Sequence, residues 1–276
     1  METAITERPT NDELLALALA IALEAGELAS RRLREGVEIA ASKSSKEDIV
    51  THADRETEAL IRRRLREQRP DDGFLGEESG SETGSSGLTW VVDPIDGTVN
   101  FFYGIPQWAI SIAVVGGEPD PATWTALAGV VANPASGEVF TATAGGGAFL
   151  GGLAIAVAAP AELSQCLVGT GFSYRAEVRA EQLEVVAGLI ARVRDIRRMG
   201  SAALDLCAVA CGRLNAYFER ELNPWDLAAG AIIAAEAGAR VSGLGGATAG
   251  KSFLLAAEPS VAESLEKVLR ESGAGR

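Results

Sequence analysis

The order of helix-like and strand-like segments predicts a layered fold of the α/β or α+β class. Long apolar periodicities of helical type alternate with short apolar runs that Gly, Pro and Asn separate. Elements of these two kinds bury their apolar faces by stacking in layers. The chain has 276 residues, of which 47% are hydrophobic, so it can form one large unit or two closely packed halves.

Two helices are predicted near the N-terminus. Residues 14–33 carry apolar side chains at helical spacing, and the capping-box pattern Thr10–Glu13 precedes them. Residues 42–51 are polar and predict a loop. Thr51 can then cap a second helix, which Pro70 ends because proline lacks the amide that a helix interior needs.

A run of short strands is predicted after the second helix. The strand-like runs are 74–75, 88–92, 108–115, 127–131 and 139–143. Residues 79–87 are rich in Ser, Gly and Thr and predict a mobile turn. Glycines at 145–147 and 151–152 bracket a hairpin or tight loop.

The second half alternates between the two kinds of element. Strands are predicted at 167–169, near 196, at 214–218, near 241 and at 253–256, and helices at 176–192, 201–212, 223–238 and 259–272. The third of these helices opens with Asn223 as its cap and Pro224 at the first helical position.

Composition excludes several classes of function. The chain has 25 basic and 38 acidic side chains, a formal charge of −13, which argues against binding nucleic acid or an anionic membrane. A phosphorylated substrate would then need a metal ion to cancel the local negative charge. His52 is the only histidine, so a histidine triad or zinc site is not expected.

Three kinds of sequence feature that are missing bear on the cellular location of the protein. The start lacks the pattern of a signal peptide, and no apolar run approaches the roughly 20 residues of a membrane span. The three cysteines have no framework spacing. We therefore expect a cytoplasmic protein.

The most informative acidic residues follow the strand at 88–92. This strand delivers Asp93 to its C-terminal end, and Pro94 and Gly97 force a tight turn that presents Asp96. Two acids three residues apart on a rigid turn can converge on one centre. Their hard oxygen atoms are the ligands that Mg²⁺ prefers.

Asp226 is the second acidic signal. It lies in the first turn of the predicted helix at 223–238, where the helix dipole stabilises a carboxylate. The small residues 228–230 would let this helix approach a sheet closely. Spacing alone does not bring Asp226 to Asp96, 130 positions earlier.

Together these motifs resemble the inositol monophosphatase family. The matching segments are Gly76–Glu78, Asp93–Thr98 with Asn100 and Phe101, Trp225–Gly230, and Lys43–Thr51. The resemblance covers roughly residues 10–270. It implies the layered α-β-α-β-α sandwich of inositol monophosphatases and fructose-1,6-bisphosphatases. We expect a single domain over 1–276, whose halves at about 10–150 and 151–272 share one active cleft.

The resemblance implies two or three Mg²⁺ ions in the cleft. Glu77, Asp93 and the backbone carbonyl of Ile95 would hold one ion. Asp93, Asp96 and Asp226 would hold a second, and Glu77 would help to hold a third through water.

The remaining implied roles concern the reacting water and the substrate. Thr98, hydrogen-bonded to Asp48, would orient and deprotonate the attacking water. The amides of Gly97 and Thr98 would bind the phosphate, and Glu219 would accept hydrogen bonds from substrate hydroxyl groups. The sugar side of the substrate would be lined by Gly200, Ser201 and Ala202.

Four of these acidic or basic residues also fit simpler explanations. Glu78 fits a surface position as well as one beside the site, and Lys43 fits a solvated loop. Asp48 could cap a local turn, and Glu219 could be an exposed acid at a strand end.

The expected function is Mg²⁺-dependent hydrolysis of a small phosphate monoester, best of all a myo-inositol monophosphate, by direct attack of water. The resemblance also implies a homodimer and inhibition by Li⁺. Histidinol phosphate, fructose 1,6-bisphosphate and a 3′-phosphoadenosine nucleotide remain alternative substrates, since Tyr103 departs from many relatives and Pro224 from some. A regulatory or binding protein that retains the scaffold is the alternative of another class.

Overall fold

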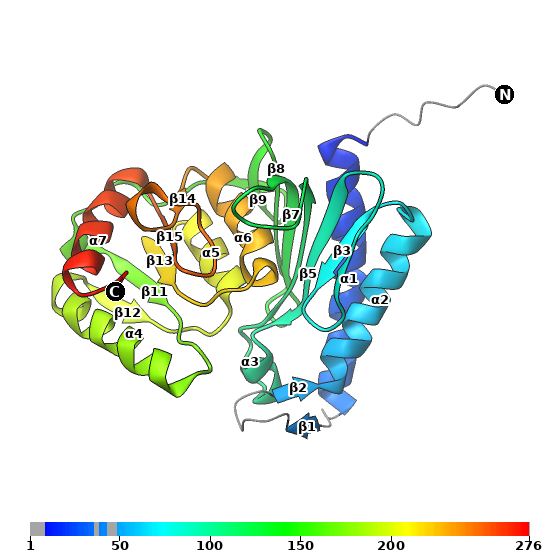
Figure 1. The fold of residues 1–276 in the computed structure, drawn as a ribbon, viewed down its shortest axis with the longest axis horizontal. Helices are drawn as coiled ribbons and strands as arrows, with labels where there is room; N and C mark the ends of the chain where they lie inside the picture. Colours follow the sequence, from blue (N-terminus) through cyan, green and yellow to red (C-terminus); the bar gives the residue numbers. More distant parts are fainter. Residues whose placement is uncertain (1–8, 36–38, 43–48, 276) are drawn as a thin grey trace.

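The computed structural model describes residues 9–35, 39–42 and 49–275. Its elements stack in five layers of alternating helix and sheet (Figure 1). The helices that form these layers are α1 (Asn11–Glu35), α2 (His52–Gln68), α4 (Ala176–Leu189), α5 (Ala202–Ala210), α6 (Pro224–Glu236) and α7 (Pro259–Glu271). The predicted α-β-α-β-α sandwich is confirmed.

The outer layer of the N-terminal half consists of α1 and α2. The predicted capping box is present, because the amide of Glu13 donates to Oγ1 of Thr10 at 3.2 Å and the amide of Thr10 donates to Oε2 of Glu13 at 2.8 Å. Apolar side chains of both helices, Ile21 and Ile61 among them, pack against one face of the larger sheet, where Trp90 of the strand at 88–96 contributes to the same cluster. This contact forms the first core.

The larger sheet has eight strands in the order β10-β9-β8-β7-β6-β5-β3-β4. Their bounds are β3 (Gly73–Gly76), β4 (Gly80–Glu82), β5 (Leu88–Asp96), β6 (Ala109–Gly116), β7 (Thr125–Asn133), β8 (Glu138–Thr143), β9 (Gly147–Leu150) and β10 (Leu153–Ile155). Every residue of β5 is buried, as expected for a strand that helices cover on both faces. The β5–β6 register shifts between Asp93 and Asp96, which breaks the regular alternation of side chains there.

The smaller sheet has five strands in the order β12-β11-β13-β15-β14. Their bounds are β11 (Leu167–Thr170), β12 (Asp195–Arg197), β13 (Ala216–Glu219), β14 (Arg240–Ser242) and β15 (Leu254–Ala257). Helices α4 and α7 cover its outer face, and α5 and α6 lie between the two sheets (Figure 1). Short helical segments complete the fold: α3 (Thr98–Phe102), η1 (Leu163–Gln165), η2 (Ile190–Arg192) and η3 (Leu244–Gly246).

Two segments differ from the sequence prediction. Within 42–51, predicted as a loop, Ser42 ends β1 (Ile39–Ser42) and pairs with Ile49 of β2 (Ile49–Thr51) in an antiparallel ladder. Within 79–87, predicted as a turn, residues 80–82 form β4 against β3. Strands β2 and β4 have only three residues each, and the polar residues beside them hid them in the sequence pattern.

Small residues let the two central helices pack closely, although not all against the sheet. A Cβ atom at Gly129 of β7 would lie 3.1 Å from the backbone of Ala229 in α6, so that residue does approach the sheet. Gly230 instead faces α5, where its Cβ would lie 2.8 Å from Leu206. In the described part of the chain, each helix is too short or too polar to cross a membrane.

Candidate active site

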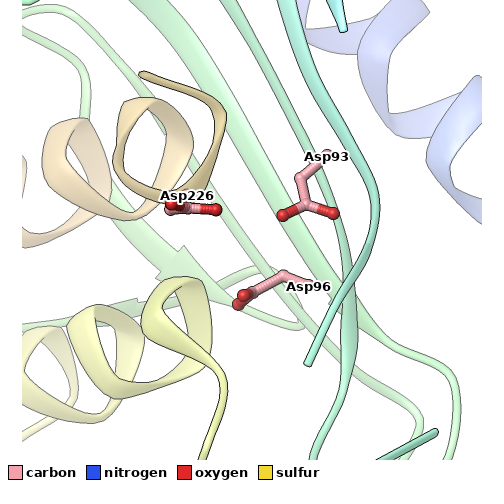
Figure 2. Close-up of side chains that lie close together, drawn as sticks. All are labelled: Asp93, Asp96 and Asp226. Atoms are coloured by element: carbon pink, nitrogen blue, oxygen red, sulfur yellow. The ribbon is translucent and has the colours of Figure 1, made fainter. Parts of the chain in front are cut away.

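A cleft lies where the end of β5 meets the beginnings of α5 and α6. Three carboxylates converge there, from Asp93 and Asp96 on β5 and from Asp226 on α6 (Figure 2). One oxygen of each lies within 4.8 Å of the others. The fold therefore brings Asp226 to Asp96, which lies 130 positions earlier in the sequence, and to Asp93, as the resemblance implied.

Local hydrogen bonds set the turn that presents the first two acids. The amide of Ile95 donates to Oδ1 of Asp93 at 3.0 Å. An aspartate that accepts from the amide two residues later in this way forms an Asx turn. The hydroxyl of Thr98 donates to the carbonyl oxygen of Ile95 at 3.1 Å. Together with the shifted β5–β6 register, these bonds direct Asp93 and Asp96 toward the same cleft.

Each of the other two carboxylates is anchored through one oxygen. Oδ2 of Asp96 accepts hydrogen bonds from the hydroxyl of Ser201 and from the amide of Ala203, the latter at 2.8 Å. Oδ2 of Asp226 accepts from the amide of Asn223 at 2.6 Å, so this acid closes the first turn of α6. The helix beginnings thus fix both side chains toward the cleft.

The cluster is electrostatically unfavourable without a cation. Burial raises the pKa of Asp96 to about 6, although the hydrogen bonds from Ser201 and Ala203 oppose the rise. Burial and the charge of Asp96 raise the pKa of Asp226 to about 8. Burial and the charge of Glu77 raise the pKa of Asp93 well above its usual range. Three hard oxygen donors in such a repulsive cluster fit a divalent cation such as Mg²⁺.

Glu77 and Glu78 diverge, although they are neighbours in sequence. Glu77 is exposed at the edge of the cleft, yet the surrounding protein and the charge of Asp226 raise the pKa of its carboxyl group well above the usual range. It lies beside the three aspartates without belonging to their closest group. Glu78 points to α2, where its carboxylate lies 3.4 Å from Arg55.

The predicted hydrogen-bond partner of Thr98 is Asp48. Asp48 lies outside the described residues, as does Lys43. Within them, Oγ1 of Thr98 lies 3.4 Å from Oδ1 of Asp54, a buried acid of α2 that sequence analysis missed. The available signal was its position, since Asp54 shares the inward face of α2 with Ile61.

Two glycines allow two backbone segments to approach each other closely beside the expected phosphate site. Gly97 and Gly200 have φ angles of 91° and 92°, a region that glycine adopts readily. A Cβ atom at Gly97 would also lie 3.0 Å from the carbonyl oxygen of Gly200. Ser201 and Ala202 border the same space, but the hydroxyl of Ser201 is turned to Asp96.

Glu219 lines the far side of the cleft at the end of β13. It accepts a hydrogen bond from the hydroxyl of Tyr217, and burial raises its pKa to about 7. Sequence analysis also missed other residues that line the cleft, among them Tyr174, Arg198 and Asp205. Asp205 is buried, and its Oδ1 has no hydrogen-bond partner among the described residues. An acid within the otherwise apolar segment 202–210 was the signal for it.

Comparisons with known proteins agree with this geometry. The chain matches the model of the inositol monophosphatase family over residues 10–274. An inositol-1-monophosphatase of Mycobacterium bovis is 48% identical over 241 residues, 83% of this chain and 80% of that protein. A Nus factor SuhB of Xylella fastidiosa is 39% identical over 265 residues, 92% of this chain and 94% of that protein. The solved structure of Mycobacterium tuberculosis SuhB has a TM-score of 0.81 at 41% identity, covering 98% of this chain and 100% of that one.

Proposed function

Because the chain belongs to the inositol monophosphatase family and is a phosphatase, we propose that it hydrolyses a myo-inositol monophosphate with Mg²⁺ as cofactor. The single observation that carries the proposal is the convergence of Asp93, Asp96 and Asp226 from two distant parts of the chain. Phosphate monoesters are anionic, and the carboxylates that line the cleft outnumber its arginines, so bound metal ions would be needed to offset the repulsion.

The proposed roles divide between ion binding and water activation. Asp93, Asp96 and Asp226 would hold one ion. Glu77, Asp93 and the backbone carbonyl of Ile95 would hold another, and Glu77 would help to hold a third through water. When bound, Mg²⁺ neutralises the phosphoryl oxygens and lowers the pKa of the attacking water.

Residues around the ions act on the water and the substrate. The hydroxyl of Thr98 orients the water, and Asp54, whose Oδ1 lies 3.4 Å from that hydroxyl, receives the proton through it in place of the expected Asp48. The amides of Gly97 and Thr98 bind the phosphate oxygens, and Glu219 accepts hydrogen bonds from the hydroxyl groups of the polyol. Gly200, Ser201 and Ala202 border the polyol ring.

The direct test compares phosphate release by the wild type and by Asp96→Asn, each with and without Mg²⁺. We expect release to require Mg²⁺ and to fall by more than about 100-fold in the variant. Calorimetric titration should show weakened Mg²⁺ binding by Asp96→Asn. The Tm of the metal-free variant should not fall below that of the metal-free wild type, because the substitution removes a repulsive charge. Asp12→Asn, at the start of α1, is the matched control. Undiminished release by Asp96→Asn would remove this residue from the mechanism.

A substrate panel tests the choice of ester. We expect inositol 1-phosphate to have a higher kcat/KM than histidinol phosphate, fructose 1,6-bisphosphate or a 3′-phosphoadenosine nucleotide. A preference of about 100-fold for histidinol phosphate would overturn the inositol assignment while leaving the chemistry intact.

The Xylella fastidiosa relative is named a Nus factor, which supports a second candidate, a regulatory protein that retains the scaffold. The same assay separates the two. Absence of release from all four esters, in a folded protein saturated with Mg²⁺, would favour the regulatory function.

We also propose that the chain acts as a cytoplasmic homodimer that does not bind nucleic acid, with both halves of each chain forming one catalytic unit. Light scattering would report the dimer. Inhibition of phosphate release by Li⁺, with Na⁺ as the control ion, would test the expected lithium sensitivity.

A further inference from the structure

A buried glutamate lies behind the proposed metal site. Glu58 is on the inward face of α2 and is only 2% exposed. It faces the tight connection between β3 and β4, which carries Glu77. Burial of a charged side chain is costly unless strong hydrogen bonds compensate it, so the position of Glu58 needs an explanation.

Both carboxylate oxygens of Glu58 accept hydrogen bonds from this connection. Oε2 accepts from the amide of Glu78 and Oε1 from the amide of Ser79, each at 2.8 Å. Hydrogen bonds to an ionised acceptor are about twice as strong as neutral ones. The two bonds fix the backbone immediately after Glu77.

The backbone immediately before Glu77 lies against the same carboxylate. A Cβ atom at Gly76 would be only 2.4 Å from Oε2 of Glu58, so glycine is the residue that allows this close approach. Glu58 therefore contacts the chain on both sides of Glu77, whereas the carboxylate of Glu77 faces the cleft.

We propose that Glu58 is a positioning residue that holds the β3–β4 connection so that Glu77 is directed at the metal ions. The proposal depends on the proposed function, because it takes Glu77 as a metal ligand. Groups that orient metal ligands in this way commonly change metal affinity by about 10- to 100-fold when they are lost.

The test measures Mg²⁺ affinity by isothermal titration calorimetry on the full chain, alongside the Tm of the metal-free protein. Glu58→Gln keeps the shape of the side chain but presents an NH₂ group to one of the two amide donors. We expect its Kd for Mg²⁺ to rise by about 10- to 100-fold. Glu56→Gln is the matched control, since this glutamate of α2 pairs with Arg32, away from the cleft. We expect its Kd to equal that of the wild type.

A double-mutant cycle with Glu77→Gln separates positioning from general stabilisation. If Glu58 acts through Glu77, adding Glu58→Gln to Glu77→Gln should not weaken Mg²⁺ binding further. Additive losses would overturn the proposal, as would an unchanged Kd in Glu58→Gln. If Glu58→Gln does not fold, Glu58→Asp provides the same comparison, because its shorter side chain cannot reach both amides.

The cycle also distinguishes the positioning role from the proposed function. No Mg²⁺ binding by the wild type would overturn both proposals. An unchanged Kd in Glu77→Gln would refute Glu77 as a ligand and with it the positioning role of Glu58, but would leave Mg²⁺-dependent hydrolysis at the three aspartates intact. A weakened Kd in Glu77→Gln with an unchanged Kd in Glu58→Gln would overturn the positioning role alone.

Discussion

The hydroxyl of Ser201 donates a hydrogen bond to Oδ2 of Asp96, which joins the start of α5 to the end of β5 across 105 positions of sequence. The same hydroxyl oxygen accepts from the amide of Leu204 at 3.3 Å and so caps α5. One small side chain therefore fixes both a helix beginning and a proposed metal ligand. This explains why Ser201, expected to line the sugar side, is turned away from the open cleft.

Ser201→Ala should lower the free energy of unfolding by about 1–2 kcal/mol, because the cap and a buried hydrogen bond are lost together. It should also raise the pKa of Asp96 above about 6, since the bond from Ser201 lowers that pKa. Urea unfolding and carboxyl NMR titration measure the two effects. Ser264→Ala is the control, because this exposed hydroxyl of α7 donates to the carbonyl of Ser260 in the same helix. Equal stability of the two variants would contradict the prediction.

The metal-free protein should lose stability as the pH rises from about 4 to 8. The usual pKa values of 3.8 for aspartate and 4.5 for glutamate are raised in the folded state, to about 6 in Asp96, 7 in Glu219 and 8 in Asp226. Between the unfolded and folded pKa values, the folded chain binds more protons than the unfolded chain. The free energy of unfolding therefore falls with increasing pH in this range.

Thermal unfolding with and without Mg²⁺ at pH 5 and pH 8 checks this expectation. Mg²⁺ should raise the Tm more at pH 8, where the carboxylates that bind it are ionised and repel one another. In Asp226→Asn the decline of the metal-free Tm toward pH 8 should be smaller. A metal-free Tm that rises between pH 5 and pH 8 would be inconsistent with the acid cluster.

Gly230→Ala tests the close packing of α5 against α6. The added Cβ would lie 2.8 Å from Leu206 and 3.2 Å from the carbonyl oxygen of Ala203, so the helices must separate. Overpacking of this kind costs about 1–3 kcal/mol, whereas the same change in an uncrowded helix is stabilising by about 0.5–1 kcal/mol. Urea unfolding of the variant and the wild type gives the sign of the change in the free energy of unfolding, which distinguishes overpacking from a gain in helix stability. A more stable variant would show that α6 does not need glycine there.

Local patterns in the sequence were sufficient where the chemistry is local. The turn that presents Asp93 and Asp96, the acid in the first turn of α6 and the capping box at Thr10 all depend on residues a few positions apart, and each was predicted. That Asp226 lies beside Asp96 was predicted from the resemblance to a family and not from the spacing of the two residues.

Long-range contacts of single side chains could not be predicted in this way. Glu58 lies 20 positions before Glu78, whose amide donates to it, and within the sequence it is one of four acids on a polar helix. Its role depends on the exact approach of α2 to the β3–β4 connection, which is a property of packing. The burial of Asp205 inside α5 depends on packing in the same way, since only tertiary structure separates a buried acid from a solvated one.

Gly171→Ala should displace the carboxylate of Glu219 without unfolding the protein. A Cβ atom at Gly171 would lie 1.9 Å from Oε2 of Glu219, which can yield because it is the end of a flexible side chain. If Glu219 accepts hydrogen bonds from the polyol, kcat/KM for inositol 1-phosphate should fall by about 10- to 100-fold. The value for p-nitrophenyl phosphate, which lacks those hydroxyl groups, should change little. Gly250→Ala is the control, since its nearest neighbour would be Pro121 at 3.9 Å. Equal losses for both substrates would show that Glu219 serves the phosphate end of the cleft instead.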